Sequence, residues 1–430
     1  MLKAGFARLD ITPPLGTPLS GYFHPRRAAG ILDPLYVNAV AVSSEKETVI
    51  LMAADLTGIR RSYVEKIQNM IEERTGVPAK NIFLAALHQH TSYVLNDASP
   101  HHPGDPALVD IVLRKMADAA VLAIADEKDA RIGAAERELD TPIAFVRRYV
   151  AEDGSIHTNP SSSVKVTGRV DEADNTVRVV RFFRDGVKDI AILNFSTHPD
   201  VISGESFSAD WPGLARIRME KTLGDVCCLF FTGAQGDSNH IDYLKPREER
   251  FFGDGRYDHA QYMGRAVADT ACAIWDGIEP TDGDEIYVDS RVIYNRTNTE
   301  GIEKYDYYRA WYNDYKAGKI KNVHITELAY ATRIIGLRTA PILHSVPLTV
   351  VGVGGVTLVG FGGEAFTAYG NAARAITPDK FVISVVCANG HEGYLPTEKA
   401  FLEGGYEPRS SLFTPTLERE LLTELSDMMK

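Results

Sequence analysis

Short, strongly apolar runs recur along this chain and constrain its fold more than any other feature. They include TVILMAADL (Thr48–Leu56), NIFLAAL (Asn81–Leu87), DIAILNF (Asp189–Phe195), VCCLFFTG (Val226–Gly233) and FVISVVCAN (Phe381–Asn389). Continuous apolar runs of this length, rich in β-branched and aromatic residues, are typical of strands that are buried on both faces. The sequence therefore predicts a sheet core at these positions.

Amphipathic patterns lie between the apolar runs. From Tyr63 to Arg74, apolar residues recur at helical spacing, and the pattern stops at Gly76. Further helices are expected at Pro106–Asp126, from Asp210, as a helix N-cap, to Gly224, and at Tyr257–Trp275, Asn322–Leu337 and Pro415–Lys430. Alternating strands and helices predict an α/β fold of layered mixed β-sheets with flanking helices. Since no repeat or linker interrupts the pattern, we expect a single domain over residues 1–430.

The stretch from Val346 to Gly363 is long and free of charge, as a membrane span would be. Its valines and six glycines suit strands better, and Gly354-Gly355 stands at its centre as a hairpin turn. We therefore expect two antiparallel strands, the second of which ends just before Glu364.

Charge and cysteine content narrow the classes of partner. The formal net charge of −12 disfavours binding to nucleic acid or anionic membranes. The four cysteines show no metal-binding spacing and are expected to be reduced. The first residues contain no long apolar segment, so no signal peptide is expected and a cytoplasmic location follows. A small-molecule substrate fits this protein best, and homo-oligomer formation stays open.

Chemically active residues follow the predicted strands where each one ends. One strand ends at His88 and His90, a second at His198, and a third at Asp237 and His240; the others end at Glu364 and at His391 and Tyr394. Imidazole nitrogens and carboxylate oxygens are ligands of zinc, and catalytic zinc sites keep one position open. If the strand ends converge, they form a metal site, although an isolated His-x-His pair is more often structural. His101 and His102 stand in a Pro/Gly loop and are expected to face solvent.

Nine short segments, spread over nearly the whole chain, carry a further signal. They are AGFARLDITPPLGTPLSGY (Ala4–Tyr22), DPLYVNAVAV (Asp33–Val42), HQHTS (His88–Ser92), FVRRYVAEDGSIHTNP (Phe145–Pro160), STHPDVIS (Ser196–Ser203), SADWPG (Ser208–Gly213), TGAQGDSN (Thr232–Asn239), LVGFGGEAFT (Leu358–Thr367) and NGHEGYLPT (Asn389–Thr397). In this order they resemble the N-terminal catalytic domain of the neutral/alkaline (non-lysosomal) ceramidase family. The resemblance implies a ceramidase-like fold and a zinc ion (Zn²⁺) bound by His88, His198, Glu364 and Tyr394, with His90 beside it as a proton carrier.

The resemblance breaks at the family's nucleophile. The family motif carries a serine where this chain has Asn239, and Ser238 falls one position early. A serine nucleophile is therefore disfavoured, and we expect zinc-activated water to attack, with His90 or Asp237 accepting the proton. Asn239 and His391 are expected to bind substrate. Arg147 and Arg148 form either a substrate clamp or structural ion pairs.

The chain also stops without the immunoglobulin-like domain that lipid-processing ceramidases carry, so we expect a short cytoplasmic relative. The favoured function is a zinc-dependent hydrolase of an amide, ester or lactone bond in a small polar, sugar-acid-like substrate. Three alternatives stay open: a true ceramidase that hydrolyses N-acylsphingosine, a zinc-dependent isomerase or lyase, and a non-catalytic ligand-binding relative.

Overall fold

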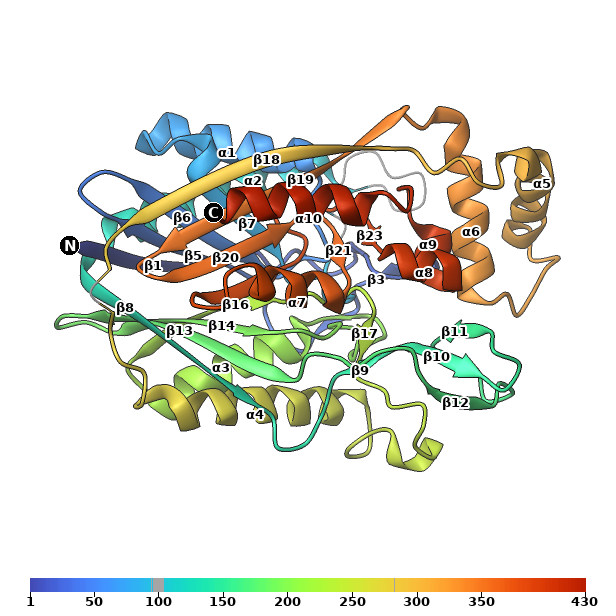
Figure 1. Ribbon diagram of the computed structural model, residues 1–430, viewed down its shortest axis with the longest axis horizontal. Coiled ribbons are helices and arrows are strands. Elements are labelled where there is room, and N and C mark those ends of the chain that lie inside the picture. The colour runs from blue at the N-terminus through green and yellow to red at the C-terminus, as the bar shows by residue number, and fades with distance from the viewer. Residues whose placement is uncertain (94, 96–103, 282) are drawn as a thin grey trace.

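The protein is described by a computed structural model, which places residues 1–93, 95, 104–281 and 283–430. His101 and His102, for which solvent exposure was predicted, lie outside the described residues. Two large β-sheets form the centre of the described part of the chain. Helices cover the outer faces of both sheets (Figure 1). The predicted α/β fold of layered mixed sheets is therefore confirmed.

The larger sheet has eight strands within the described residues. Parallel pairing joins β14 to β16 and β6 to β7, and the remaining neighbours are antiparallel. In spatial order the strands are β16 (Val226–Thr232), β14 (Asp189–Phe195), β13 (Thr176–Arg184), β8 (Lys128–Glu138), β1 (Leu2–Asp10), β5 (Tyr36–Ser43), β6 (Thr48–Ala54) and β7 (Ile82–Ala86).

The smaller sheet contains the hairpin that was predicted around Gly354-Gly355. Its strands, in order, are β18 (Ile286–Arg296), β19 (Leu343–Val353), β20 (Val356–Phe361) and β22 (Phe381–Val385). Both turn glycines have positive φ, +51° and +88°, which suits residues without a Cβ atom. Among the described residues, no helix combines the length and apolarity that crossing a membrane requires.

Ten α-helices lie in the described residues, and four short 3₁₀ turns accompany them. Helices α1 and α2 pack together, α3 and α4 pack on the β16 side of the larger sheet, and α7 and α10 cover the smaller sheet (Figure 1). Their bounds are α1 (Arg61–Thr75), α2 (Pro106–Ala125), α3 (Asp210–Leu223), α4 (Arg256–Trp275), α5 (Tyr305–Lys316), α6 (Ile325–Gly336), α7 (Thr367–Ile376), α8 (Glu398–Glu403), α9 (Tyr406–Ser410) and α10 (Leu417–Met428), with 3₁₀ turns at Ala79–Asn81, Arg247–Glu249, Ile302–Lys304 and Leu337–Thr339.

Short strands complete the fold around the ends of the two sheets. They are β2 (Pro18–Leu19), β3 (Arg26–Arg27), β4 (Gly30–Ile31), β9 (Phe145–Val146), β10 (Arg148–Ala151), β11 (Ile156–Thr158), β12 (Val166–Arg169), β15 (Ser206–Phe207), β17 (Ser238–Asn239), β21 (Glu364–Ala365) and β23 (Tyr394–Leu395). Two pairings among these short strands join segments that carry predicted site residues. Strand β17 pairs with β9, and β21 pairs with β23.

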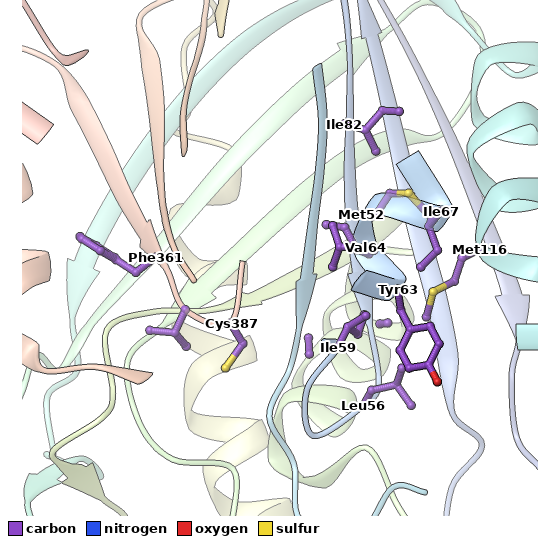
Figure 2. Packing of buried hydrophobic residues seen from close by; sticks show 14 of the residues in the cluster. Met52, Leu56, Ile59, Tyr63, Val64, Ile67, Ile82, Met116, Phe361 and Cys387 are labelled. Carbon is purple, nitrogen blue, oxygen red and sulfur yellow. The ribbon is translucent and has the colours of Figure 1, made fainter. Parts of the chain in front are cut away.

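The two sheets face each other across a buried apolar layer. Within this layer Phe83 of β7 and Phe231 of β16, from the two opposite edges of the larger sheet, meet edge to face, with ring centroids 5.6 Å apart. A Cβ atom at Gly360 of β20 would lie 2.4 Å from the Phe83 ring, so only glycine permits this close approach of the sheets. On the opposite face of the larger sheet, Tyr63 and Val64 of α1 lie in one core cluster with Met52 of β6 (Figure 2).

The predicted elements agree with the observed ones to within a few residues. One detail differs at α3, where Ala209 and not Asp210 is the N-cap residue. Asp210 is the first helical residue, with φ of +53°, and its carboxylate accepts hydrogen bonds from the backbone N–H groups of Val201, Ile202 and Trp211. The side chain therefore fastens the loop after His198 to the start of α3.

Candidate metal centre

Hydrogen bonds between strand ends bring the predicted site residues together. After β22 the chain leaves the smaller sheet and joins β7, where Asn389 N–H donates to the Leu84 carbonyl (2.7 Å). The Asn389 side chain accepts from Leu84 N–H in return (3.0 Å). At the neighbouring end of β16, the Thr232 hydroxyl donates to the Leu87 carbonyl (2.8 Å), directly before His88. These contacts place the ends of both sheets at one point.

His88 occupies a strained backbone position that fixes its side chain. Its φ of +72° is uncommon for a residue other than glycine, and such strain is characteristic of functional sites. The Thr57 carbonyl lies 2.7 Å from Nδ1 of His88 and accepts its proton, so Nδ1 carries the hydrogen. When the ring is neutral, the opposite nitrogen, Nε2, therefore carries the lone pair that can bind a metal.

Three buried atoms without a hydrogen-bond partner among the described residues face one another: Nε2 of His88, Nε2 of His198 and Oε2 of Glu364. The glutamate oxygen lies 3.1 Å from the His88 nitrogen and 3.7 Å from the His198 nitrogen. A tetrahedral zinc ion with bonds of about 2.0–2.1 Å separates its ligand atoms by about 3.3–3.4 Å. Orphaned donors at this spacing fit a metal ion.

His90 is the third imidazole of the same cluster. Ligand atoms of His88, His90 and His198 all lie within 4.8 Å of one another. The ring of His90 is 5.2 Å from that of His88 and 5.4 Å from that of His198, centroid to centroid. His391 approaches from the more exposed side, with Nε2 3.4 Å from Oε1 of Glu364. Both residues therefore border the candidate metal position.

A second set of possible ligands, His88, Cys387 and His391, also lies within 4.8 Å. It fits a metal less well. The Cys387 sulfur faces Nδ1 of His88 (3.8 Å), the nitrogen whose proton the Thr57 carbonyl accepts. Burial raises the pKa of the Cys387 thiol, which keeps it protonated, whereas the thiolate is the form that binds metals.

Burial shapes the protonation of the cluster. It lowers the pKa of His198 well below the ordinary value, and that of His90 to about 4, so both rings are neutral and available as ligands or bases. Burial raises the pKa of the Glu364 carboxyl, but the surrounding imidazoles, His88 first, hold it well below its usual range. Burial lowers the pKa of His88, but the Glu364 charge outweighs it and raises that pKa well above the ordinary value, so His88 must lose a proton before its Nε2 can bind a metal. The centre thus offers the neutral rings of His90 and His198, the Glu364 carboxylate and, once it is deprotonated, Nε2 of His88.

Tyr394 stands beside Glu364 because the two are register partners in the parallel pair of β21 and β23. Burial, with the Glu364 charge, raises the pKa of the Tyr394 phenol, so the side chain is neutral without a cation nearby. The Arg147 guanidinium carbon lies over the Tyr394 ring, 5.4 Å from its centroid. The centroid of the Tyr406 ring lies 5.4 Å from that of the Tyr394 ring. Arg147 thus borders the site.

Arg148 binds carboxylates and makes no such contact with Tyr394 or Tyr406 among the described residues. Its guanidinium binds the carboxylates of Glu407 (3.2 Å) and Glu403 (3.0 Å). Of the two interpretations that the sequence left open, the structural ion pair describes Arg148. Arg147 also binds Glu407 (2.8 Å), but it retains contact with the tyrosine pair.

The altered nucleophile motif lies on β17, next to Arg147. The Ser238 hydroxyl is fully buried, and its one proton is shared between the backbone carbonyls of Ser196 (3.3 Å) and Gln235 (3.4 Å). Asp237 accepts two hydrogen bonds of 2.8 Å from Thr367, at the start of α7.

The amide group of Asn239 lies 3.3 Å from that of Asn159. Hydrogen bonds thus engage Asp237, Ser238 and Asn239 within the protein.

Sequence reasoning assigned no role to several residues that the fold adds to the site. Asp200 faces His90, and the Tyr22 hydroxyl donates to Asp200. Glu407 and Tyr406 reach the site from α9. Asp200 stands only two positions after His198, which was a usable signal. Nothing in the local pattern around α9 indicates that it meets β10.

Comparisons with known proteins give a similar fold. No protein-family model matches the sequence, and no curated protein does. The crystal structure of neutral ceramidase from Pseudomonas aeruginosa matches with a TM-score of 0.73 and 18% identity, over 99% of this chain and 74% of that one. A structure described as ceramidase complexed with C2 matches with a TM-score of 0.76 and 17% identity, over the same shares.

Proposed function

We propose that this protein is a zinc-dependent hydrolase of an amide, ester or lactone bond in a small polar substrate. The observation that carries the proposal is the meeting of three buried ligand atoms, from His88, His198 and Glu364, that have no hydrogen-bond partner among the described residues and lie at metal-ligand spacing. Tyr394, the register partner of Glu364, would complete the ligand set. The similarity of the fold to neutral ceramidases supports hydrolysis of an acyl bond.

The chain's own residues supply the remaining functions. A zinc ion in such a site lowers the pKa of water towards about 7 and polarises a carbonyl group. His90, neutral and within the cluster, accepts the proton that the attacking water loses. Arg147 lies beside the phenol rings of Tyr394 and Tyr406, where its charge stabilises negative charge that develops on the substrate oxygen.

Metal analysis of protein purified without chelator tests the proposal. We expect about one zinc ion per chain, and His88→Ala or Glu364→Ala should lose it, because each removes one of the few protein ligands of the proposed site. The matched control is His157→Ala, whose imidazole interacts with Ser155 on the surface, outside the cluster. Zinc well below one per chain in the unaltered protein, unchanged by His88→Ala, would reject the proposal.

Ceramidase activity is the second candidate, because both structural neighbours are ceramidases. A fluorescent N-acylsphingosine, assayed beside small polar amides, esters and lactones, separates the two. Turnover of the lipid alone would favour the ceramidase. Binding without turnover across the whole panel would favour the non-catalytic relative.

A further inference from the structure

A loop near the N-terminus holds His90 in place. Gly21 has a φ of +98°, and a Cβ atom at this position would lie 2.6 Å from Cα of His90. From the same loop, Nη2 of Arg26 donates to the His90 carbonyl (2.7 Å), and the Tyr22 ring meets the imidazole edge to face at 5.5 Å. The backbone and the ring of His90 are therefore both constrained.

Asp200 faces the constrained imidazole. Its Oδ1 lies 3.5 Å from Nδ1 of His90, and the Tyr22 hydroxyl donates to the same oxygen. Both ring nitrogens of His90 are buried and have no hydrogen-bond partner among the described residues. The carboxylate is an acceptor, so it favours the tautomer in which Nδ1 carries the proton.

We infer that Asp200 is a positioning residue for His90, with Tyr22 holding the carboxylate in place. The inference rests on the proposed function, in which His90 accepts a proton. With Nδ1–H directed at Asp200, Nε2 carries the free lone pair of a ring whose centroid lies 5.2 Å from that of His88 and 5.4 Å from that of His198. As the water oxygen bonds to the substrate carbonyl carbon, the C=O π bond breaks and its electron pair moves to the carbonyl oxygen. One water proton moves to Nε2, and the Nδ1 proton stays between the ring and Asp200.

The tautomer of His90 is the first test, and it needs no substrate. Nitrogen-15 NMR of histidine-labelled, zinc-loaded protein reports which ring nitrogen is protonated, and His90→Gln assigns the signal. We expect the Nδ1–H tautomer in the unaltered protein and a shift towards Nε2–H in Asp200→Asn. The matched control is Glu205→Gln, an exposed acid in the same segment. An Nε2–H tautomer in the unaltered protein, or no change in Asp200→Asn, would overturn the inference.

Kinetics give the second test. General acid–base catalysis contributes about 10²–10⁴-fold, so Asp200→Asn should lower kcat at least about tenfold with little change in KM. Tyr22→Phe, which keeps the ring but loses the hydroxyl, should show a smaller loss.

The zinc content of Asp200→Asn distinguishes a failure of this inference from a failure of the proposed function. It should be unchanged in Asp200→Asn, and loss of zinc would assign Asp200 to the metal instead and refute the inference. An unchanged kcat despite an altered tautomer would refute it too. If the unaltered protein hydrolyses nothing, the proposed function fails and the NMR result alone decides the role of Asp200.

Discussion

Glu407 offers the sharpest test of how the site is supported. Its fully buried carboxylate accepts hydrogen bonds from Nε of Arg147 (2.8 Å), Nη1 of Arg148 (3.2 Å) and the Thr158 hydroxyl (2.8 Å). Removing one partner of a buried ion pair costs about 3–5 kcal/mol, mostly because the other charge stays buried without compensation. Glu407→Ala leaves two such charges.

The loss of stability in Glu407→Ala is reduced because each arginine keeps one other hydrogen-bond acceptor. Arg147 keeps the Gly236 carbonyl (2.9 Å), and Arg148 keeps Glu403, whose side chain is 21% exposed. We therefore expect Glu407→Ala to lower the free energy of unfolding by about 3–5 kcal/mol in urea, measured by circular dichroism at fixed zinc concentration. Glu403→Ala should cost less, because water can partly replace its carboxylate.

Asp269→Ala is the matched control. It breaks a bidentate pair with Arg218 in which both side chains are nearly half exposed, so about 0–1 kcal/mol is expected. If Glu407→Ala costs no more than Asp269→Ala, the reasoning from burial is refuted. Enzyme assays on the folded variant add a second readout, because Arg147 would lose the contact that directs it towards Tyr394.

Three further predictions follow from residues around the site. Ser238→Ala should lower kcat/KM less than about tenfold, that is by under about 1.4 kcal/mol, whereas a collapse with zinc retained and a trapped acyl-enzyme would show a serine nucleophile. Burial lowers the pKa of His259 to about 4, so the unfolded chain binds a proton that the native protein does not. This difference should make stability fall as the pH falls from about 6.5 to about 4, by up to about 1.4 kcal/mol per unit, and urea titrations of His259→Gln should show a pH slope that is smaller by this amount. Gly21→Ala should impair turnover through its clash with His90, unlike Gly16→Ala, which has equally positive φ but open space; equal activity of the two variants would contradict this.

Much of the fold could be predicted because its signals are local. Buried strands such as β14 are continuous apolar runs, and the hairpin of β19 and β20 has its own glycine turn. The end of each run also marked candidate ligands, since a polar residue directly after a buried strand must lie at the edge of the sheet. His88, His198 and Glu364 were found in this way, and the structure places them together.

The supporting contacts could not be predicted, because they join segments with no shared local pattern. Glu407 meets Arg147 across 260 positions, so no periodicity relates the two residues. The direction of Arg148 depends on the same contact, and the sequence therefore left a clamp and an ion pair equally open. The N-cap at Asp210 was misplaced by one residue because its carboxylate binds the preceding loop as well as the helix.

The ligands proposed for the metal lie between residue 88 and residue 394, which has a consequence for how the protein would mature. During synthesis, the two histidines leave the ribosome long before the carboxylate and the phenol that they meet. A growing chain therefore carries imidazoles without the rest of the ligand set, and the complete set exists only once the C-terminal third has docked. Metal capture would accompany this last docking step, so that bound metal marks chains that have finished folding.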